Sequence, residues 1–259
     1  MLNKIKSNFY APFHLYLREV RRFTITYNQT LIGPVLSSLM YLLIFFLILR
    51  SNNNDASLFQ KMHLISIGMM VNSVVNAAFN NVISSLIIAK VVGYINDIIV
   101  VPISTHGIIF AYVSASLTRS LFVGGIFFLI LNFFFSFTLY HPFLLVFYFF
   151  FSCSMLSMLG LIAGCLCNTF EQSSSINNYF ITPLSLLSCT FFSVNELSST
   201  MQFIVKLNPF FYFIDGFKYV FVNHADSNIG LGILLMCIVN FLLYFLSNLV
   251  LHRGIGIKN

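Results

Sequence analysis

Six long apolar stretches constrain this chain of 259 residues more than any other feature of its sequence. A helix needs about 20 mostly apolar residues to cross the hydrocarbon core of a bilayer, and most of these stretches reach that length without a central charge. Together they take up about half of the chain, which leaves no room for a soluble catalytic domain. The stretches are Leu31–Leu49, His63–Ile88, Ser120–Leu139, Phe143–Cys167, Asn177–Val194 and Ile229–Leu251.

The composition indicates that lipid is the solvent of this chain. Hydrophobic residues make up 58% of the sequence and charged residues only 8%, whereas soluble domains carry roughly 25% charged residues. In lipid the backbone polar groups must be satisfied within the protein, and a helix satisfies them within one segment. We therefore predict an all-α integral membrane protein with six transmembrane helices in a single domain over residues 1–259.

The distribution of Lys and Arg predicts the orientation of the chain in the membrane. If six helices cross, both termini lie on one side, and that side carries nine cations against four on the other. The positive-inside rule makes the nine-cation side cytoplasmic, as expected for a multi-pass protein of the inner membrane. The net charge of +6 is thus explained by topology and lipid headgroups, and we expect no nucleic-acid partner. The nine are Lys4, Lys6, Arg18, Arg21, Arg22, Lys90, Arg119, Arg253 and Lys258, and the four are Arg50, Lys61, Lys206 and Lys218.

Residues 1–30 show the pattern of an amphipathic helix. Apolar and aromatic side chains recur every three or four residues, and basic residues fall largely on the other side. Such a helix lies in the membrane plane with its basic face toward anionic headgroups, although a disordered basic tail is an alternative. The first set is Phe9, Phe13, Tyr16, Val20, Phe23 and Tyr27, and the second is His14, Arg18, Arg21 and Arg22.

The second apolar stretch carries amides at a helical spacing. Asn72, Asn76 and Asn80 recur every four residues and so share one helix face. Amides in hydrocarbon need partners, so this face is expected to point into the bundle. Two roles are open at this point: contacts that hold helices together, which we favour slightly, and the lining of a substrate path.

Two further features are expected to shape the cytoplasmic side and the fifth stretch. Between Lys90 and Arg119, Asn96 and Asp97 are suited to cap a short interfacial helix that Pro102 ends. A partner protein would have a place to dock there, or the helix would merely lie on lipid. Pro183 falls inside the fifth stretch and predicts a kink or unwinding of that helix.

The outer connection over residues 195–228 is too apolar for an exposed loop. Two short helices that dip into the outer leaflet and return would fit it, since each is too short to cross. Asn208 and Pro209 form a favourable helix start, with Asn as cap and Pro in the first turn. Asp215 and Lys218 stand three residues apart and are expected to pair.

The chain lacks the motifs of an ATPase, a zinc protease or a serine hydrolase. Its six histidines do not cluster as metal ligands, and we expect no metal and no catalytic residue. A proton-coupled carrier normally has an acidic residue in the middle of a span, and no acidic residue here occupies such a place. Energy for any transport is therefore expected to come from another protein.

Taken in order, these pieces resemble the permease subunits of ABC type-2 exporters, over nearly the whole chain. The resemblance divides the domain into an interface helix (1–30), five spans (31–194), re-entrant helices (195–228) and a last span with its tail (229–259). The chain departs from the family where it has Ser188-Cys189 in place of a frequent Ser-Gly, and Lys218 in place of Arg. The matching segments are Gly93-Tyr-Ile-Asn-Asp-Ile-Ile-Val-Val-Pro102-Ile, Thr182-Pro183-Leu184-Ser185, Leu207-Asn208-Pro209-Phe210-Phe211-Tyr212 and Gly216-Phe217-Lys218-Tyr219.

The resemblance implies half of a transporter: a homodimer in membrane lipid that recruits a separate ATPase, which would hold ATP and Mg, while this chain needs no cofactor. The implied cargo is lipidic, lipid-linked or amphiphilic and moves outward. An ion- or proton-coupled carrier and a lipid-modifying membrane enzyme are the alternatives. The resemblance implies ATPase-coupling residues Arg18, Arg21, Arg22, Gly93, Asn96, Asp97 and Pro102, and path or gate residues Asn72, Asn76, Asn80, Pro183, Asn208, Pro209, Asp215 and Lys218.

Overall fold

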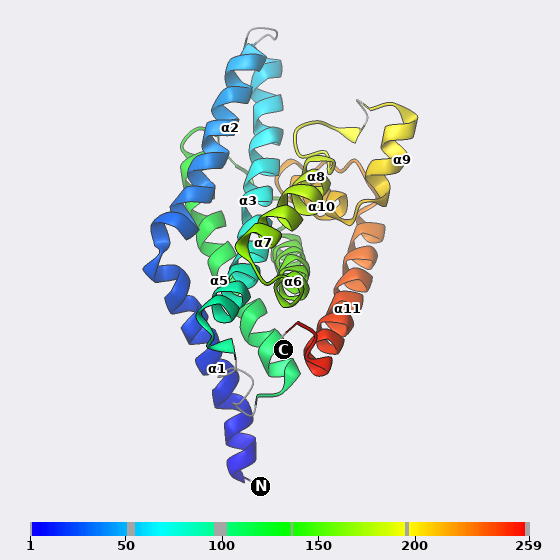
Figure 1. Ribbon diagram of the computed structural model, residues 1–259. Coiled ribbons are helices and arrows are strands. Elements are labelled where there is room, and N and C mark those ends of the chain that lie inside the picture. Colours follow the sequence, from blue (N-terminus) through cyan, green and yellow to red (C-terminus); the bar gives the residue numbers. More distant parts are fainter. Residues whose placement is uncertain (1, 51–54, 96–102, 136, 195–196, 257–259) are drawn as a thin grey trace.

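The computed structural model describes residues 2–50, 55–95, 103–135, 137–194 and 197–256, and within these ranges every regular element is a helix (Figure 1). The expected all-α membrane fold is therefore confirmed. The elements are α1 (Leu2–Ile25), the π-helical η1 (Asn28–Ile32), α2 (Gly33–Arg50), α3 (Asp55–Val92), α5 (Thr105–Asn132), α6 (Pro142–Leu166), α7 (Phe170–Ile176), the π-helical η2 (Asn177–Ile181), α8 (Thr182–Leu186), α9 (Ser199–Leu207), α10 (Pro209–Val222) and α11 (Ile229–Arg253).

Helix α3 is the centre of the bundle and packs against α2, α5, α6 and α10. Five helical segments of the described chain are long and apolar enough to cross a membrane, which fits a multi-pass protein. These segments are Asn28–Arg50, Lys61–Val92, Thr105–Asn132, Pro142–Leu166 and Ile229–Arg253.

The third crossing begins earlier than the sequence predicts. The apolar stretch was expected from Ser120, because Arg119 interrupts it, but α5 starts at Thr105. Ser104 caps this helix by accepting a hydrogen bond from the Gly107 amide. Arg119 is buried and donates to the main-chain oxygen of Thr30, so the cation is accommodated inside the bundle.

The fifth predicted stretch differs most from its expected form. Elements α7, η2 and α8 follow one another from Phe170 to Leu186, which corresponds to about 25 Å of helix and is short for a full crossing. The π-helical turn lies directly before Pro183, so the helix is locally unwound at the expected place. A sixth crossing by this segment stays a prediction.

The outer connection forms two short helices, α9 and α10, as predicted. The Asn208 side chain caps α10 by accepting a hydrogen bond from the Phe210 amide, and Pro209 occupies the first turn. Asn223 ends the helix with a left-handed backbone at φ 56°. Most of α10 is buried among α3, α6 and α11, so this helix is part of the core.

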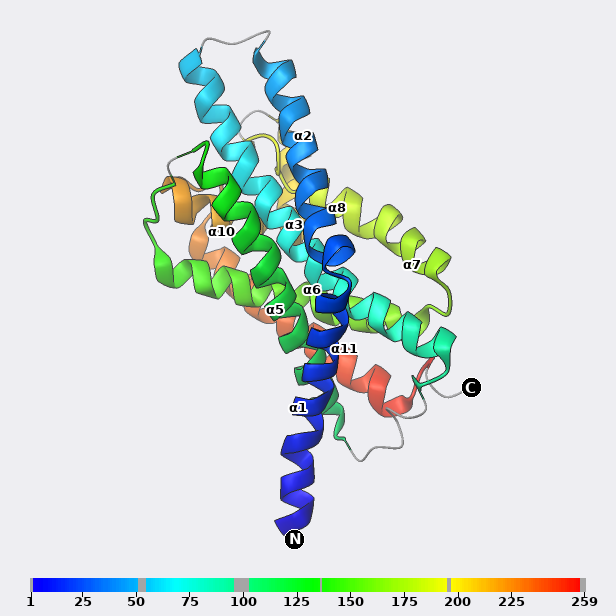
Figure 2. The same cartoon turned by 90° about the vertical axis from the view of Figure 1, so that its left-hand side faces the viewer.

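Helix α1 packs along α5, and its first turns project beyond the lower end of the bundle (Figures 1 and 2). Its inward face carries Leu15, Glu19 and Phe23, which recur every four residues and are buried. The helix is therefore confirmed. Its second half, however, is held by the bundle and does not lie freely on a lipid surface.

Candidate functional site

A stripe of partly exposed residues runs along helix α3, which is otherwise mostly buried. Between Ile65 and Ala89, five residues of α3 that are spaced four apart are partly exposed. All the remaining residues of this segment are buried. Four of the five are polar, so the exposed part of this central helix is a line of amides and a hydroxyl. We call these four the α3 stripe: Asn72, Asn76, Asn80 and Ser84, with Ile88 continuing it.

The α3 stripe is internally connected at the end that begins with Asn72. The Asn76 side-chain nitrogen donates to the main-chain oxygen of Asn72 at 2.9 Å and to its side-chain oxygen at 2.6 Å. The same Asn72 oxygen accepts a hydrogen bond from the Ser185 hydroxyl on α8. One predicted path residue thus fixes the α3 stripe to the helix that contains Pro183.

Exposed apolar side chains flank the α3 stripe on both sides. Figure 1 shows α3 between α2 on one side and α7 and α8 on the other. Helix α2 has one buried residue, Val35, and its other side chains are at least partly exposed. On η2, Tyr179 and Phe180 are exposed as well. The arrangement is a polar line set between the exposed apolar side chains of α2 and those of η2.

Two residues predicted to form a gate, Asn208 and Lys218, connect the end of α8 to α10. The Asn208 side-chain nitrogen donates to the main-chain oxygen of Leu184 at 2.6 Å and to the Ser188 hydroxyl at 3.0 Å. Lys218 is buried and its ammonium group donates to the main-chain oxygens of Cys189 and Phe192. A buried cation that saturates carbonyls at a helix end stabilises that end.

Asp215 fixes the other side of the same helix. Its carboxylate accepts from the amides of Asp226 and Ser227 at 2.9 Å each, and from the Ser227 hydroxyl at 2.5 Å. Asp226 in turn accepts from the Ser193 hydroxyl at 2.7 Å and the Val194 amide at 3.1 Å. Asp215 and Lys218, expected mainly as a pair, therefore tie α10 to two different segments.

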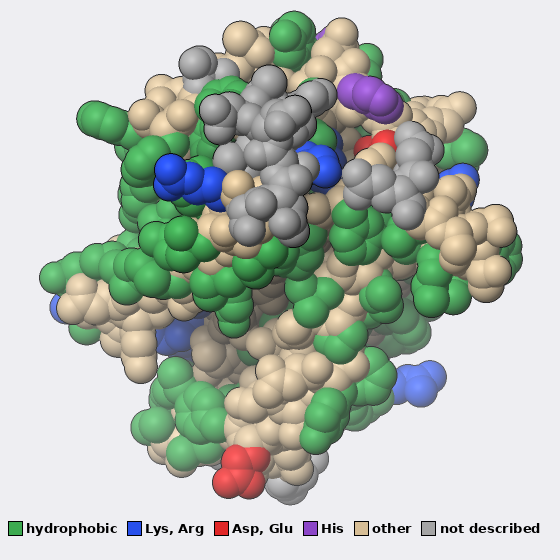
Figure 3. Space-filling view, turned by 90° about the horizontal axis from the view of Figure 1, so that it is seen from above, with side chains coloured by type: hydrophobic (Ala, Val, Ile, Leu, Met, Phe, Trp, Pro, Cys, Tyr) green, Lys and Arg blue, Asp and Glu red, His purple; other side chains and the backbone are tan. Residues whose placement is uncertain are grey.

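Viewed from this end, hydrophobic side chains cover much of the molecule, with isolated cations among them (Figure 3).

At the opposite end, Glu19 joins α1 to α3. Glu19 is fully buried and forms ion pairs with Arg18 at 2.9 Å and with Arg22 at 3.0 Å. Arg22 also donates to the main-chain and side-chain oxygens of Asn81 at 2.7 and 3.0 Å, and to the Ser84 hydroxyl at 3.3 Å. The expectation that Arg22 faces lipid headgroups is wrong, because Glu19 and α3 draw its guanidinium inward.

Glu19 was missed by the sequence reasoning. The available signal was its place midway between Leu15 and Phe23, which puts a carboxylate on the apolar face of an amphipathic helix. A buried carboxylate needs a cation, and Arg18 and Arg22 are the neighbours that reach it.

The remaining predicted coupling residues lie in different settings. The Arg18 guanidinium also stacks over the Tyr94 ring at 5.2 Å, and burial is the main reason why the pKa of Tyr94 is raised. Gly93, with φ 91°, adopts a left-handed backbone just after α3 ends. Arg21 is exposed. Asn96, Asp97 and Pro102 lie outside the described residues.

Comparison with known proteins agrees with a membrane permease built in this way. A family model described as "ABC-2 type transporter" matches residues 12–222. The chain is 32% identical over 247 residues to "Inner membrane transport permease YadH" of Escherichia coli K12, which covers 95% of this chain and 96% of that protein. Proteins of the same name from Escherichia coli O157:H7 and Shigella flexneri match equally well.

The class is thus a transport permease of the inner membrane. More specifically, the chain belongs to the ABC-2 type transporter family. Membership of this family implies a partner ABC ATPase subunit.

Proposed function

We propose that this chain is the membrane subunit of an ATP-driven exporter that moves a lipidic, lipid-linked or amphiphilic molecule outward. Energy would come from a separate ATPase chain that binds ATP and Mg, and both termini of this chain would lie in the cytoplasm. The observation that carries the proposal is the α3 stripe, a polar line left partly exposed on the most central helix.

The α3 stripe favours a path over simple helix contacts. Polar groups that only hold helices together are normally enclosed, because an amide facing lipid without partners is costly. Asn76 and Asn80, like the other residues of the α3 stripe, remain partly exposed although the residues between them are buried. The polar part of an amphiphilic cargo would form hydrogen bonds with these amides. Its apolar chains would pack against the exposed apolar side chains of α2 and η2.

A second copy of the chain would complete the path. The exposed α2 and η2 side chains give each protomer an apolar rim around the α3 stripe, which is the surface that another membrane helix would cover. Two copies facing each other would enclose two such polar lines in one channel. The proposed assembly is therefore a homodimer with one ATPase docked on each cytoplasmic end.

The contact between Glu19 and Arg22 offers a direct route for mechanical coupling. Arg22 belongs to the helix proposed to meet the ATPase, and it binds Ser84, the last polar residue of the α3 stripe. A displacement of α1 would therefore act on the same helix that lines the path. At the far end, Asn208 and Lys218 would keep α8 and α10 moving as one gate.

The proposal is tested by replacing two amides of the α3 stripe. The wild-type chain and its ATPase, reconstituted in vesicles with a fluorescent nitrobenzoxadiazole-labelled phospholipid, should move the probe between leaflets only when ATP is hydrolysed. Asn76→Leu with Asn80→Leu should abolish that movement while the complex still assembles. The control Asn132→Leu changes an exposed amide at the end of α5 and should leave transport intact. Transport that ignores ATP, or that survives the double change, would refute the proposal.

A further inference from the structure

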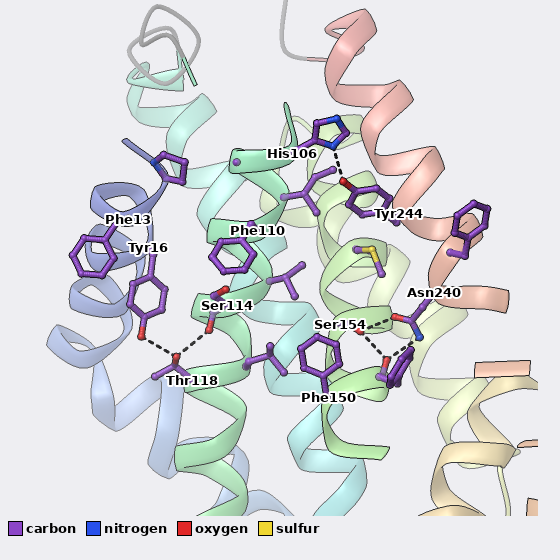
Figure 4. A pocket seen from close by; sticks show the side chains of 18 of the residues that line it. Phe13, Tyr16, His106, Phe110, Ser114, Thr118, Phe150, Ser154, Asn240 and Tyr244 are labelled. Atoms are coloured by element: carbon purple, nitrogen blue, oxygen red, sulfur yellow. Dashed lines mark hydrogen bonds between the residues drawn. The ribbon is translucent and has the colours of Figure 1, made fainter. Parts of the chain in front are cut away.

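A groove lies on a part of the molecule that shares no residue with the α3 stripe or with the contacts of Asn208 and Lys218. It is a groove of about 970 Å³ between α1, α5, α6 and α11 (Figure 4). That volume lies at the upper end of the range found for ligand sites. Its walls include Tyr16, Phe110, Phe150, Asn240 and Tyr244.

The polar atoms within this groove are already paired with one another. The Tyr16 hydroxyl bonds to that of Thr118 at 3.2 Å. The Ser154 hydroxyl donates to the Asn240 side-chain oxygen at 2.6 Å, and the Asn240 nitrogen donates to the Phe151 carbonyl at 3.1 Å. Figure 4 shows these pairs across the lower part of the groove. A molecule in this part of the groove would therefore meet mainly apolar side chains, and these paired groups would need no hydrogen bond from it.

The groove opens where lipid reaches it. Three of its walls are helices long and apolar enough to cross the membrane, and Phe110 and Phe241 at its sides are 69% and 72% exposed. The groove is therefore lined by apolar side chains and lies beside the lipid, so an acyl chain of a neighbouring lipid is suited to enter it.

The end of the groove nearest the C-terminus is polar, and basic residues follow beyond it on α11. The His106 ring bonds to the Tyr244 hydroxyl at 2.5 Å and stacks against that ring, which bridges α5 and α11. One turn farther along α11, Asn248 accepts a hydrogen bond from Thr105 at 2.6 Å. His252 continues the same spacing of four residues, beside Arg253, and both are exposed in the last turn of α11. None of the acidic residues that the structure describes lines the groove.

We propose that this groove is a binding site for an acidic phospholipid, with one acyl chain in the groove and the phosphate at His252 and Arg253. The lipid is a bound component of the permease and not its cargo. An acyl chain gains little by moving from bilayer into the groove, since both surroundings are apolar. Selectivity therefore comes from the last turn of α11, where Arg253 favours an anionic headgroup by about five-fold.

The absence of tryptophan from the chain makes a clean test possible. Phe150→Trp places a single reporter in the groove, and Phe143→Trp places one outside it, on a side chain that is 90% exposed at the start of α6. Each variant is reconstituted with brominated phosphatidylglycerol or brominated phosphatidylcholine as quencher. The Phe150→Trp reporter should show at least a five-fold preference for the acidic lipid, while Phe143→Trp should show none.

A second pair of variants separates the site from ordinary surrounding lipid. Arg253→Ala in the Phe150→Trp background should remove most of the preference for phosphatidylglycerol, whereas Lys206→Ala, at the other end of the molecule, should leave it unchanged. In native mass spectrometry, the wild-type protein should retain phosphatidylglycerol in preference to phosphatidylcholine. This measurement needs no Trp variant, so it tests the proposal even if a reporter variant folds poorly. Equal quenching of both reporters by both lipids, or a preference that survives Arg253→Ala, would overturn the proposal. No ATPase is needed, so the result is independent of the export proposal.

Discussion

Glu19→Gln is the change that most directly probes how α1 is held. The substitution keeps the shape of the side chain but removes the charge that two arginines share. Glu19 has a fully buried side chain, while those of Arg18 and Arg22 are 39% and 19% exposed. Breaking a fully buried ion pair costs about 3–5 kcal/mol. Water reaches both arginines in part and the Gln oxygen still accepts a bond, so we expect a loss of about 1–3 kcal/mol.

The loss is measured by thermal unfolding of the purified chain in detergent. For a chain of this size, each kcal/mol corresponds to about 2–4 °C in Tm, so a drop of several degrees is expected. Arg21→Gln, an exposed cation on the same helix, should change stability by less than about 0.5 kcal/mol. Replacing Glu19 and Arg22 together by Leu and Met should recover part of the loss, because the buried carboxylate is gone and Arg18, whose side chain is 39% exposed, still reaches water. If Glu19→Gln matches the wild type, or Arg21→Gln is equally harmful, the inferred role of Glu19 is refuted.

Three further predictions concern other parts of the fold. Asp215→Ala leaves two partly buried amides without an acceptor and should lower stability by about 2–4 kcal/mol in detergent unfolding, against about 1 kcal/mol for Ser227→Ala. The backbone of Cys189 is left-handed, with φ at 56°, so the Cys189→Val variant should be about 2 kcal/mol less stable than the Cys189→Gly variant in the same assay. Equal stabilities of the two variants would contradict the left-handed conformation. A Cβ on Gly160 would lie 2.6 Å from the Phe79 carbonyl, whereas one on Gly125 meets open space. Gly160→Ala should therefore lower Tm and Gly125→Ala should raise it slightly, and the reverse order would show that the helix contact is misjudged.

The sequence was sufficient for features that depend on local chemistry. The length of the apolar stretches predicts the helices, and the cap of α10 follows from Asn208 and Pro209 alone. The unwinding before Pro183 follows from the missing amide hydrogen of proline. Each of these outcomes is decided by a few neighbouring residues, which is why a single sequence predicts them.

Features that depend on distant partners were not predicted. The third crossing begins before Arg119 because Thr30, far away in the sequence, accepts its hydrogen bonds. Glu19 was overlooked because its burial depends on how α1 packs on α5 and how Arg22 reaches α3. The spacing of Asn72, Asn76 and Asn80 was visible, but their partial exposure depends on which neighbours leave that side of α3 uncovered. The hypothesis of a path gained its main support only from that exposure.

The spacing of the α3 stripe also imposes a direction of turning. Residues four apart in an α-helix advance by about 400°, so each polar residue is displaced by about 40° around α3 and about 6 Å along it. From Asn72 to Ser84 the line of polar groups therefore winds about 120° around the helix over about 18 Å. A molecule that contacted these polar groups one after another would therefore rotate about the axis of α3 as it advanced.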